Sequence, residues 1–169
     1  MSLDQEPGPD LLPGQMTGGP LTIRMRMPSD PRLLPVVRNA ISEFAAVCGF
    51  DKVQCRRIAL AVDEALSNVI RHAYKNRCDC EVELDCQLQK DCLEVAFVDH
   101  GEPTDPSRLC PQPLDELALG GRGTHLIHQI MDEVCYERLG ERNLLRLKKY
   151  LPAANSKASR PADQVRGKA

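Results

Sequence analysis

The sequence lacks three features, and each absence argues against a class of protein. No apolar run approaches the roughly 18 residues that a helix needs to cross a bilayer. The first residues have neither the basic start nor the apolar middle of a signal peptide, so we expect a cytoplasmic protein without a membrane partner. The formal net charge is -2 and the pI about 6.1. Without a basic surplus, nucleic acid is not expected as a direct partner.

The eight cysteines match neither a disulfide framework nor a usual zinc site. A disulfide framework is not expected in a protein without a secretory signal. Cys78, Cys80, Cys86 and Cys92 lie within 15 residues, but no paired Cys-x-x-Cys spacing or histidine occurs among them. Cys80 and Cys86 alternate with apolar residues, which favours small apolar strand positions over metal ligands.

The chain has the length and pattern of a single domain between two tails. Its 169 residues leave room for one core of ordinary size, and no internal repeat divides them. We expect disordered tails at residues 1–19 and 152–169, because neither segment shows periodicity. The folded domain is then expected at residues 20–151.

Apolar periodicity predicts the element order β-α-α-β-β-loop-α-β-β. We expect strands at 21–27, 80–88, 92–98, 134–139 and 143–150, and helices at 31–48, 52–74 and 124–134. Gly49 is expected to end the first helix and Asp51 to cap the second. This order predicts an α+β fold, a two-layer α/β sandwich with helices on one face of a mixed, mainly antiparallel sheet.

The second expected helix carries polar side chains next to an apolar stripe. Glu64, Asn68 and His72 recur every four residues, which places them on one helix face about a turn apart. A carboxylate and an amide so close to a core are costly unless they are satisfied. We therefore expect a ligand to meet Glu64 and Asn68, whereas His72 is interpreted as a structural histidine near the helix end.

Two further segments have residue types that suit a nucleotide. Asp99-His-Gly101 ends an expected strand, where the carboxylate could accept a hydrogen bond from a ligand amine or simply cap the loop. Gly120-Gly-Arg-Gly123 leads into a helix, where glycines let the backbone approach a phosphate, although a plain turn is the alternative. The common phosphate loop, the dinucleotide fingerprint and the protein-kinase catalytic loop are absent, so a nucleotide site would have another design.

Together and in this order, the three segments resemble the ATP-binding fold shared by gyrase B, MutL, heat-shock chaperones and sensor histidine kinases. The matching residues are Glu64 and Asn68 on the helix, Asp99 and Gly101 in Asp-x-Gly, and Gly121 and Gly123 before the last helix. Within that superfamily, residues 63–74 and the Met-Asp-Glu-Val at 131–134 resemble the bacterial anti-sigma-factor serine/threonine kinases. Those proteins bind a sigma factor and phosphorylate a small anti-anti-sigma protein, and dimers are common among them.

The resemblance implies roles for the residues on the helix and at the strand end. Asn68 would give its amide oxygen to Mg²⁺, a hard ion that prefers oxygen ligands. Glu64 would accept the proton of the attacking hydroxyl or hold that hydroxyl in line. Asp99 would accept a hydrogen bond from the adenine amino group of ATP, and Gly101 would leave room for the ring.

The resemblance also implies how the phosphates are held. Backbone N–H groups around Gly121, Arg122, Gly123 and Thr124 would bind them. The Arg122 side chain would add a charge-assisted contact or face solvent. The loop 102–120 would be the lid over ATP.

The expected function is that of an ATP- and Mg²⁺-dependent serine/threonine kinase. Its partners would be an anti-anti-sigma protein as substrate and a sigma factor that it sequesters, and it could form a homodimer. Two alternatives stay open: a nucleotide-gated module that binds a partner without phosphorylating it, and an ATPase domain that needs other subunits. An autophosphorylating histidine kinase is disfavoured, because no phosphoacceptor histidine helix precedes the ATP-binding segments.

Overall fold

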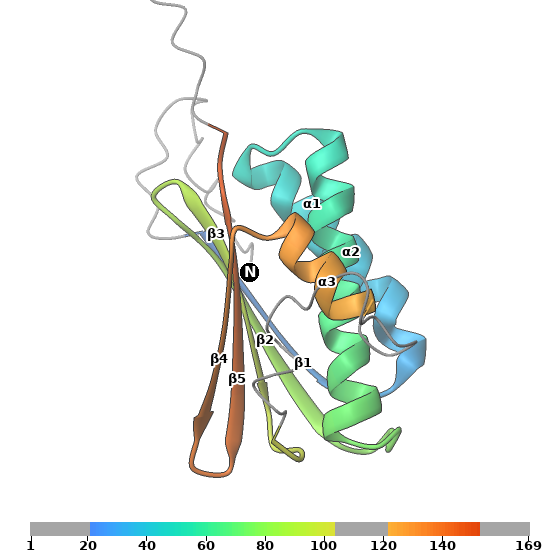
Figure 1. Ribbon diagram of the computed structural model, residues 1–169. Coiled ribbons are helices and arrows are strands. Elements are labelled where there is room, and N and C mark those ends of the chain that lie inside the picture. The colour runs from blue at the N-terminus through green and yellow to red at the C-terminus, as the bar shows by residue number, and fades with distance from the viewer. Residues whose placement is uncertain (1–20, 104–121, 153–169) are drawn as a thin grey trace, which may run out of the picture.

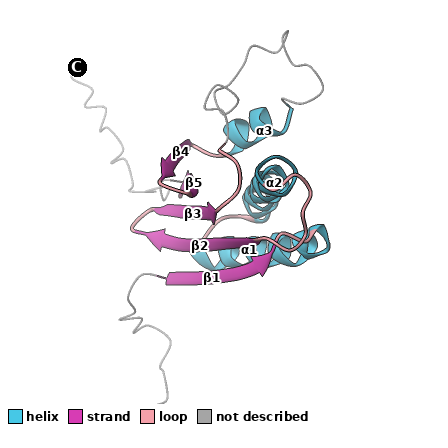
Figure 2. Cartoon of the chain, turned by 90° about the horizontal axis from the view of Figure 1, so that it is seen from below, coloured by secondary structure: helices cyan, strands magenta, loops and turns pink. Residues whose placement is uncertain are grey.

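The computed structural model describes residues 21–103 and 122–152, except for the side chain of Arg122, and these residues form two layers (Figures 1 and 2). The strands are β1 (Leu21–Pro28), β2 (Glu81–Gln89), β3 (Cys92–Asp99), β4 (Glu133–Leu139) and β5 (Arg142–Tyr150). The helices are α1 (Leu34–Cys48), α2 (Lys52–Asn68) and α3 (Arg122–Ile130). A 3-10 turn, η1 (Pro31–Leu33), precedes α1, and α2 continues into a π-helical turn, η2 (Val69–Ala73).

The strands form one sheet with the order β1-β2-β3-β5-β4. Every neighbouring pair is antiparallel, so the described sheet is not mixed. Figure 2 shows the helices side by side on one face, with α1 towards β1 and α3 towards β4. The predicted α+β two-layer sandwich is therefore confirmed. The predicted tails lie outside the described residues, apart from Pro152.

The core lies between the sheet and the helical layer because inward and outward residues alternate along the strands. In β2 the inward side chains of Val82, Leu84 and Cys86 are fully buried. Ile58 of α2 and Phe97 of β3 meet in the same core. Burial of these apolar side chains, at about 1.5–3 kcal/mol each, is the main stabilising contribution to the fold.

Four of the described cysteines are buried, and Cys78 and Cys135 are exposed. Cys86 is fully buried, and its burial raises the pKa of the thiol to about 12. Cys80 lies just before β2 and packs against the core. Within residues 21–103 and 122–152, the cysteines are free thiols and no cluster of His, Cys, Asp or Glu could hold a metal ion.

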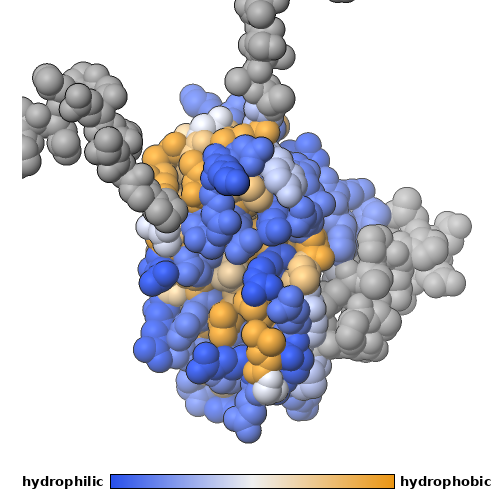
Figure 3. Space-filling view, turned by 90° about the vertical axis from the view of Figure 1, so that its left-hand side faces the viewer, coloured by the Kyte–Doolittle hydropathy of each residue, from blue (hydrophilic) through white to orange (hydrophobic). Residues whose placement is uncertain are grey.

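No described helix covers the other face of the sheet, where Figure 3 shows hydrophilic residues around smaller apolar patches. Ion pairs join neighbouring strands there: Arg24 with Asp85, Arg146 with Glu137 and Lys148 with Glu133. Exposed pairs of this kind contribute little to stability. These side chains point outward because of the same alternation that buries the side chains of the inward face.

Among the described helices, none combines the length and apolar character that a bilayer span requires.

Local capping signals set the helix ends largely as predicted. Gly49 ends α1 with a left-handed φ of +103°, which glycine adopts without strain. The Asp51 carboxylate caps α2 by accepting hydrogen bonds from the backbone N–H groups of Val53 and Gln54, at 2.9 and 2.8 Å.

One helix boundary was predicted wrongly. The helix expected at 124–134 ends at Ile130, and β4 already begins at Glu133. The Asp132 backbone N–H donates to the Lys148 carbonyl, and the Asp132 carboxylate accepts from the Tyr150 N–H. Pairing with β5 therefore prevails over the helical apolar pattern, because tertiary contacts override a weak local preference.

Candidate functional site

The polar face of α2 ends where the helix widens into η2. Glu64 lies in the last turns of α2, and 24% of its side chain is exposed. Its Oε1 accepts a hydrogen bond from Nη2 of Arg71, at 3.2 Å. Asn68 is partly buried, and its side chain makes no hydrogen bond within the described residues. Asn68 directly precedes a π turn, a feature that often occurs at functional sites.

The first turn of α3 lies against Glu64. A Cβ placed on Gly123 would be 1.9 Å from Oε1 and 2.8 Å from Cγ of Glu64, so only glycine allows this approach. Thr124 follows in the same turn and is partly buried. The unpaired N–H groups of a helix start favour an anion there. Gly121 and the side chain of Arg122 lie outside the described residues.

Asp99 is a buried carboxylate at the end of β3, with 4% of its surface exposed. Burial raises the pKa of its carboxyl, while hydrogen bonds from Asn143 and Gly101 oppose that rise. Both bonds end on Oδ1, from Asn143 Nδ2 at 2.7 Å and from the Gly101 N–H at 2.9 Å. No hydrogen bond from the described residues reaches Oδ2. Among the described residues, Oδ2 is therefore the carboxylate oxygen without a hydrogen bond.

Asn143 is a site residue that sequence reasoning missed. It is 1% exposed and lies directly opposite Asp99 in the β3–β5 register. Its Oδ1 accepts from the Tyr136 hydroxyl at 2.7 Å and from Arg138 Nη1 at 2.6 Å. These two donors fix the amide so that Nδ2 points to Asp99. The available signal was an amide in alternation with the inward-facing Leu145 and Leu147.

The turn after Asp99 packs against the end of η2 and is hydrogen-bonded to it. A Cβ on Gly101 would lie 2.5 Å from the Ala73 carbonyl oxygen, and the Glu102 N–H donates to that oxygen at 2.9 Å. The Tyr74 hydroxyl donates to the Glu81 carbonyl and accepts from the His100 N–H. Gly101 is thus required for packing on Ala73, and its predicted role beside the adenine ring stays a prediction.

This packing makes a stability prediction for Gly101→Ala. The added Cβ overlaps backbone atoms of Ala73 that cannot rotate away, so we expect the free energy of unfolding to fall by about 1–3 kcal/mol. Urea denaturation measures the change. Gly140→Asn is the control, because its φ of +61° suits asparagine and no atom lies within 4 Å of a Cβ there. Equal midpoints for Gly101→Ala and the wild type would contradict the close contact.

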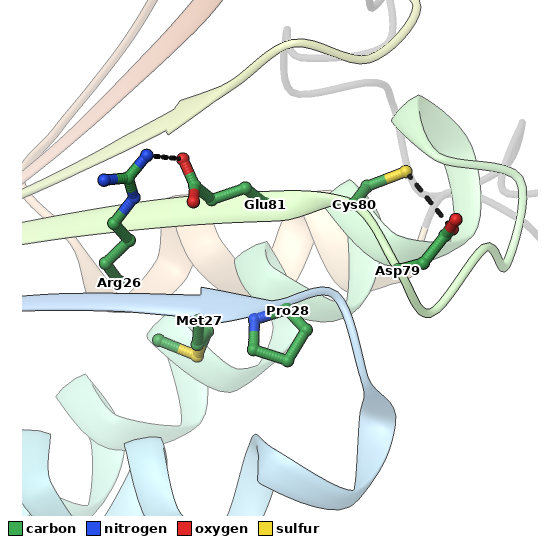
Figure 4. A pocket seen from close by; sticks show the side chains of 6 residues that line it. All are labelled: Arg26, Met27, Pro28, Asp79, Cys80 and Glu81. Carbon is green, nitrogen blue, oxygen red and sulfur yellow. Dashed lines mark hydrogen bonds and ion pairs between the residues drawn. The ribbon is translucent and has the colours of Figure 1, made fainter.

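Other polar features lie apart from this arrangement. His72 is exposed, and within the described residues its side chain has no hydrogen bond. A hollow of about 500 Å³ lies between the ends of β1 and β2 (Figure 4). Its lining residues are Arg26, Met27, Pro28, Asp79, Cys80 and Glu81. It contains none of the predicted nucleotide-binding residues, and its Arg26–Glu81 pair is an exposed cross-strand ion pair.

The described residues bring the start of α3 against Glu64 of α2, and they attach the turn after Asp99 to the end of η2. Residues 27–149 match the family of the histidine kinase-like ATPase domain. The chain belongs to this family. Its relatives include the serine-protein kinases RsbW of Bacillus subtilis and Oceanobacillus iheyensis, which are 32% and 29% identical over 120 residues. These matches cover 66% of this chain and 75% and 76% of the relatives, and they confirm the resemblance to anti-sigma-factor kinases.

A solved structure supports the fold assignment. The RsbU and RsbW domains of a Mycobacterium tuberculosis protein align with a TM-score of 0.58 at 14% sequence identity. The alignment covers 78% of this chain and 32% of that chain. At this identity the likeness shows a shared fold.

Proposed function

We propose that the protein is an ATP- and Mg²⁺-dependent serine/threonine kinase that phosphorylates an anti-anti-sigma protein and sequesters a sigma factor. The observation that carries the proposal is the contact of Glu64 with the first turn of α3. It brings the expected proton acceptor next to the helix start that favours phosphate. The similarity to the RsbW serine-protein kinases supports the same assignment.

The residues fit both ATP and its metal ion. Asn68 offers an amide oxygen without another partner among the described residues, which suits Mg²⁺. When bound, the ion would neutralise charge on the phosphates. The first turn of α3 would hold the phosphates through Gly123 and Thr124, with Gly121 and Arg122 completing the segment. Asp99 would accept the adenine amino group on Oδ2 and so fix the other end of the nucleotide.

The proposed chemical step needs a proton acceptor in line with the terminal phosphate. The partner's serine or threonine oxygen forms a bond to the γ-phosphorus, while the bond from this phosphorus to the β–γ bridging oxygen breaks. The electron pair of the broken bond leaves with ADP. Glu64 accepts the hydroxyl proton, as general base catalysis requires.

Capture followed by labelling tests this function. Proteins from the host extract are captured on the tagged chain with and without Mg-ATP, and those retained are incubated with the pure chain and γ-labelled ATP. We expect label on a serine or threonine of a small captured protein, and nucleotide-dependent retention of a sigma factor. Tight ATP binding without transfer would support the nucleotide-gated binding module instead. The expected homodimer is read from the molar mass by light scattering.

A further inference from the structure

The contact between Glu64 and Arg71 suggests how the carboxylate is positioned. Nη2 of Arg71 donates to Oε1 of Glu64 at 3.2 Å, and the same oxygen faces Gly123. Within the described residues, no hydrogen bond reaches Oε2 of Glu64. Among the described residues, one carboxylate oxygen is therefore held and the other has no hydrogen bond.

Arg71 is itself anchored by the end of α2. Its Nε donates to the Ser67 carbonyl at 3.3 Å, so the guanidinium is held at two points. Arg71 lies in η2, seven residues after Glu64, which places both side chains on the same side of the helix. Asn68 lies between them in the chain. About half of the Arg71 side chain is exposed, at 51%, so it contributes little to the core.

We propose that Arg71 is the positioning residue of Glu64. A catalytic base is commonly oriented by a third group that binds the side of the base not used in the reaction. The Arg71 bond is charge-assisted and restrains the rotation of the carboxylate. It occupies Oε1 and directs Oε2 towards the incoming hydroxyl. This inference rests on the proposed function, because it assigns Arg71 a part in the same phosphate transfer.

The rate of phosphate transfer from γ-labelled ATP to the captured partner protein tests this role. Arg71→Gln is expected to lower kcat about tenfold or more, because the charged hydrogen bond is lost, and to leave the KM for ATP unchanged. Arg71→Lys should recover part of the loss, since a lysine can still reach the carboxylate. Arg57→Gln is the matched control: it removes the same charge from an exposed position of α2 and should keep the wild-type kcat. The thermal midpoint of each variant checks that folding is unchanged.

A double-mutant cycle with Glu64→Gln separates positioning from other roles. In the Glu64→Gln background, Arg71→Gln should have no further effect on the residual transfer, because there is no base left to orient. An equal loss in both backgrounds would overturn the proposal. So would a raised KM for ATP at constant kcat, which would make Arg71 a phosphate contact. If Glu64→Gln alone leaves transfer at the wild-type rate, the proposed function of Glu64 fails, and the assignment of Arg71 falls with it.

Discussion

Glu64→Gln is expected to reduce phosphate transfer by about 10²–10⁴-fold while ATP still binds. Glutamine has the same shape, so the close approach of Gly123 is preserved and Oε1 can still accept from Arg71. The amide cannot take up the proton of the attacking hydroxyl. Transfer of label from γ-labelled ATP to the partner gives the rate, and calorimetric titration gives the nucleotide affinity.

The matched control for this variant is Glu43→Gln, which removes a carboxylate from an exposed position of α1. It should transfer phosphate at the wild-type rate. Capture of the sigma factor should persist in Glu64→Gln, because binding of a partner does not require the chemical step. Wild-type transfer by Glu64→Gln would show that another group accepts the proton.

The fold was predictable because its signals are local. The inward alternation of Val82, Leu84 and Cys86 predicts a half-buried strand, and burial in the structure matches it. Gly49 and Asp51 end one helix and start the next through interactions within a few residues of each other. The position of Glu64 and Asn68 on one helix face is predictable in the same way, because it depends only on the helical period.

The parts that local patterns do not specify depend on contacts between segments far apart in the sequence. Asn143 meets Asp99 only because β3 and β5 pair in one particular register, which no local pattern specifies. The contact of Gly123 with Glu64 likewise joins α3 to α2, and the glycine pattern alone does not identify its neighbour. The role of Arg71 depends on the side-chain contact with Glu64, which a sequence does not display.

Asp99→Asn is expected to weaken ATP binding about tenfold to a hundredfold, because an acceptor bond to a charged group is lost. The structural bonds survive: an asparagine Oδ1 still accepts from the Gly101 N–H and from Asn143 Nδ2. The open Oδ2 becomes an NH₂ group, which faces the adenine amino group as donor against donor. Calorimetric titration measures the affinity, with Asp91→Asn as control, since it alters an exposed aspartate just before β3.

Asp99→Asn should raise the free energy of unfolding although it weakens ATP binding, so the two measurements separate lost binding from lost folding. Burial raises the pKa of Asp99 in the folded chain above its unfolded value. The protonated form therefore favours folding, and the wild type loses this contribution as the pH rises through the raised pKa. Asparagine does not ionise, so the unfolding free energy of the variant should rise relative to that of the wild type as the pH increases above about 4, the ordinary pKa of an aspartate. Urea midpoints across this range measure the difference. A variant that binds weakly and is also less stable at pH 7 would show that Asp99 acts through the fold rather than on the nucleotide.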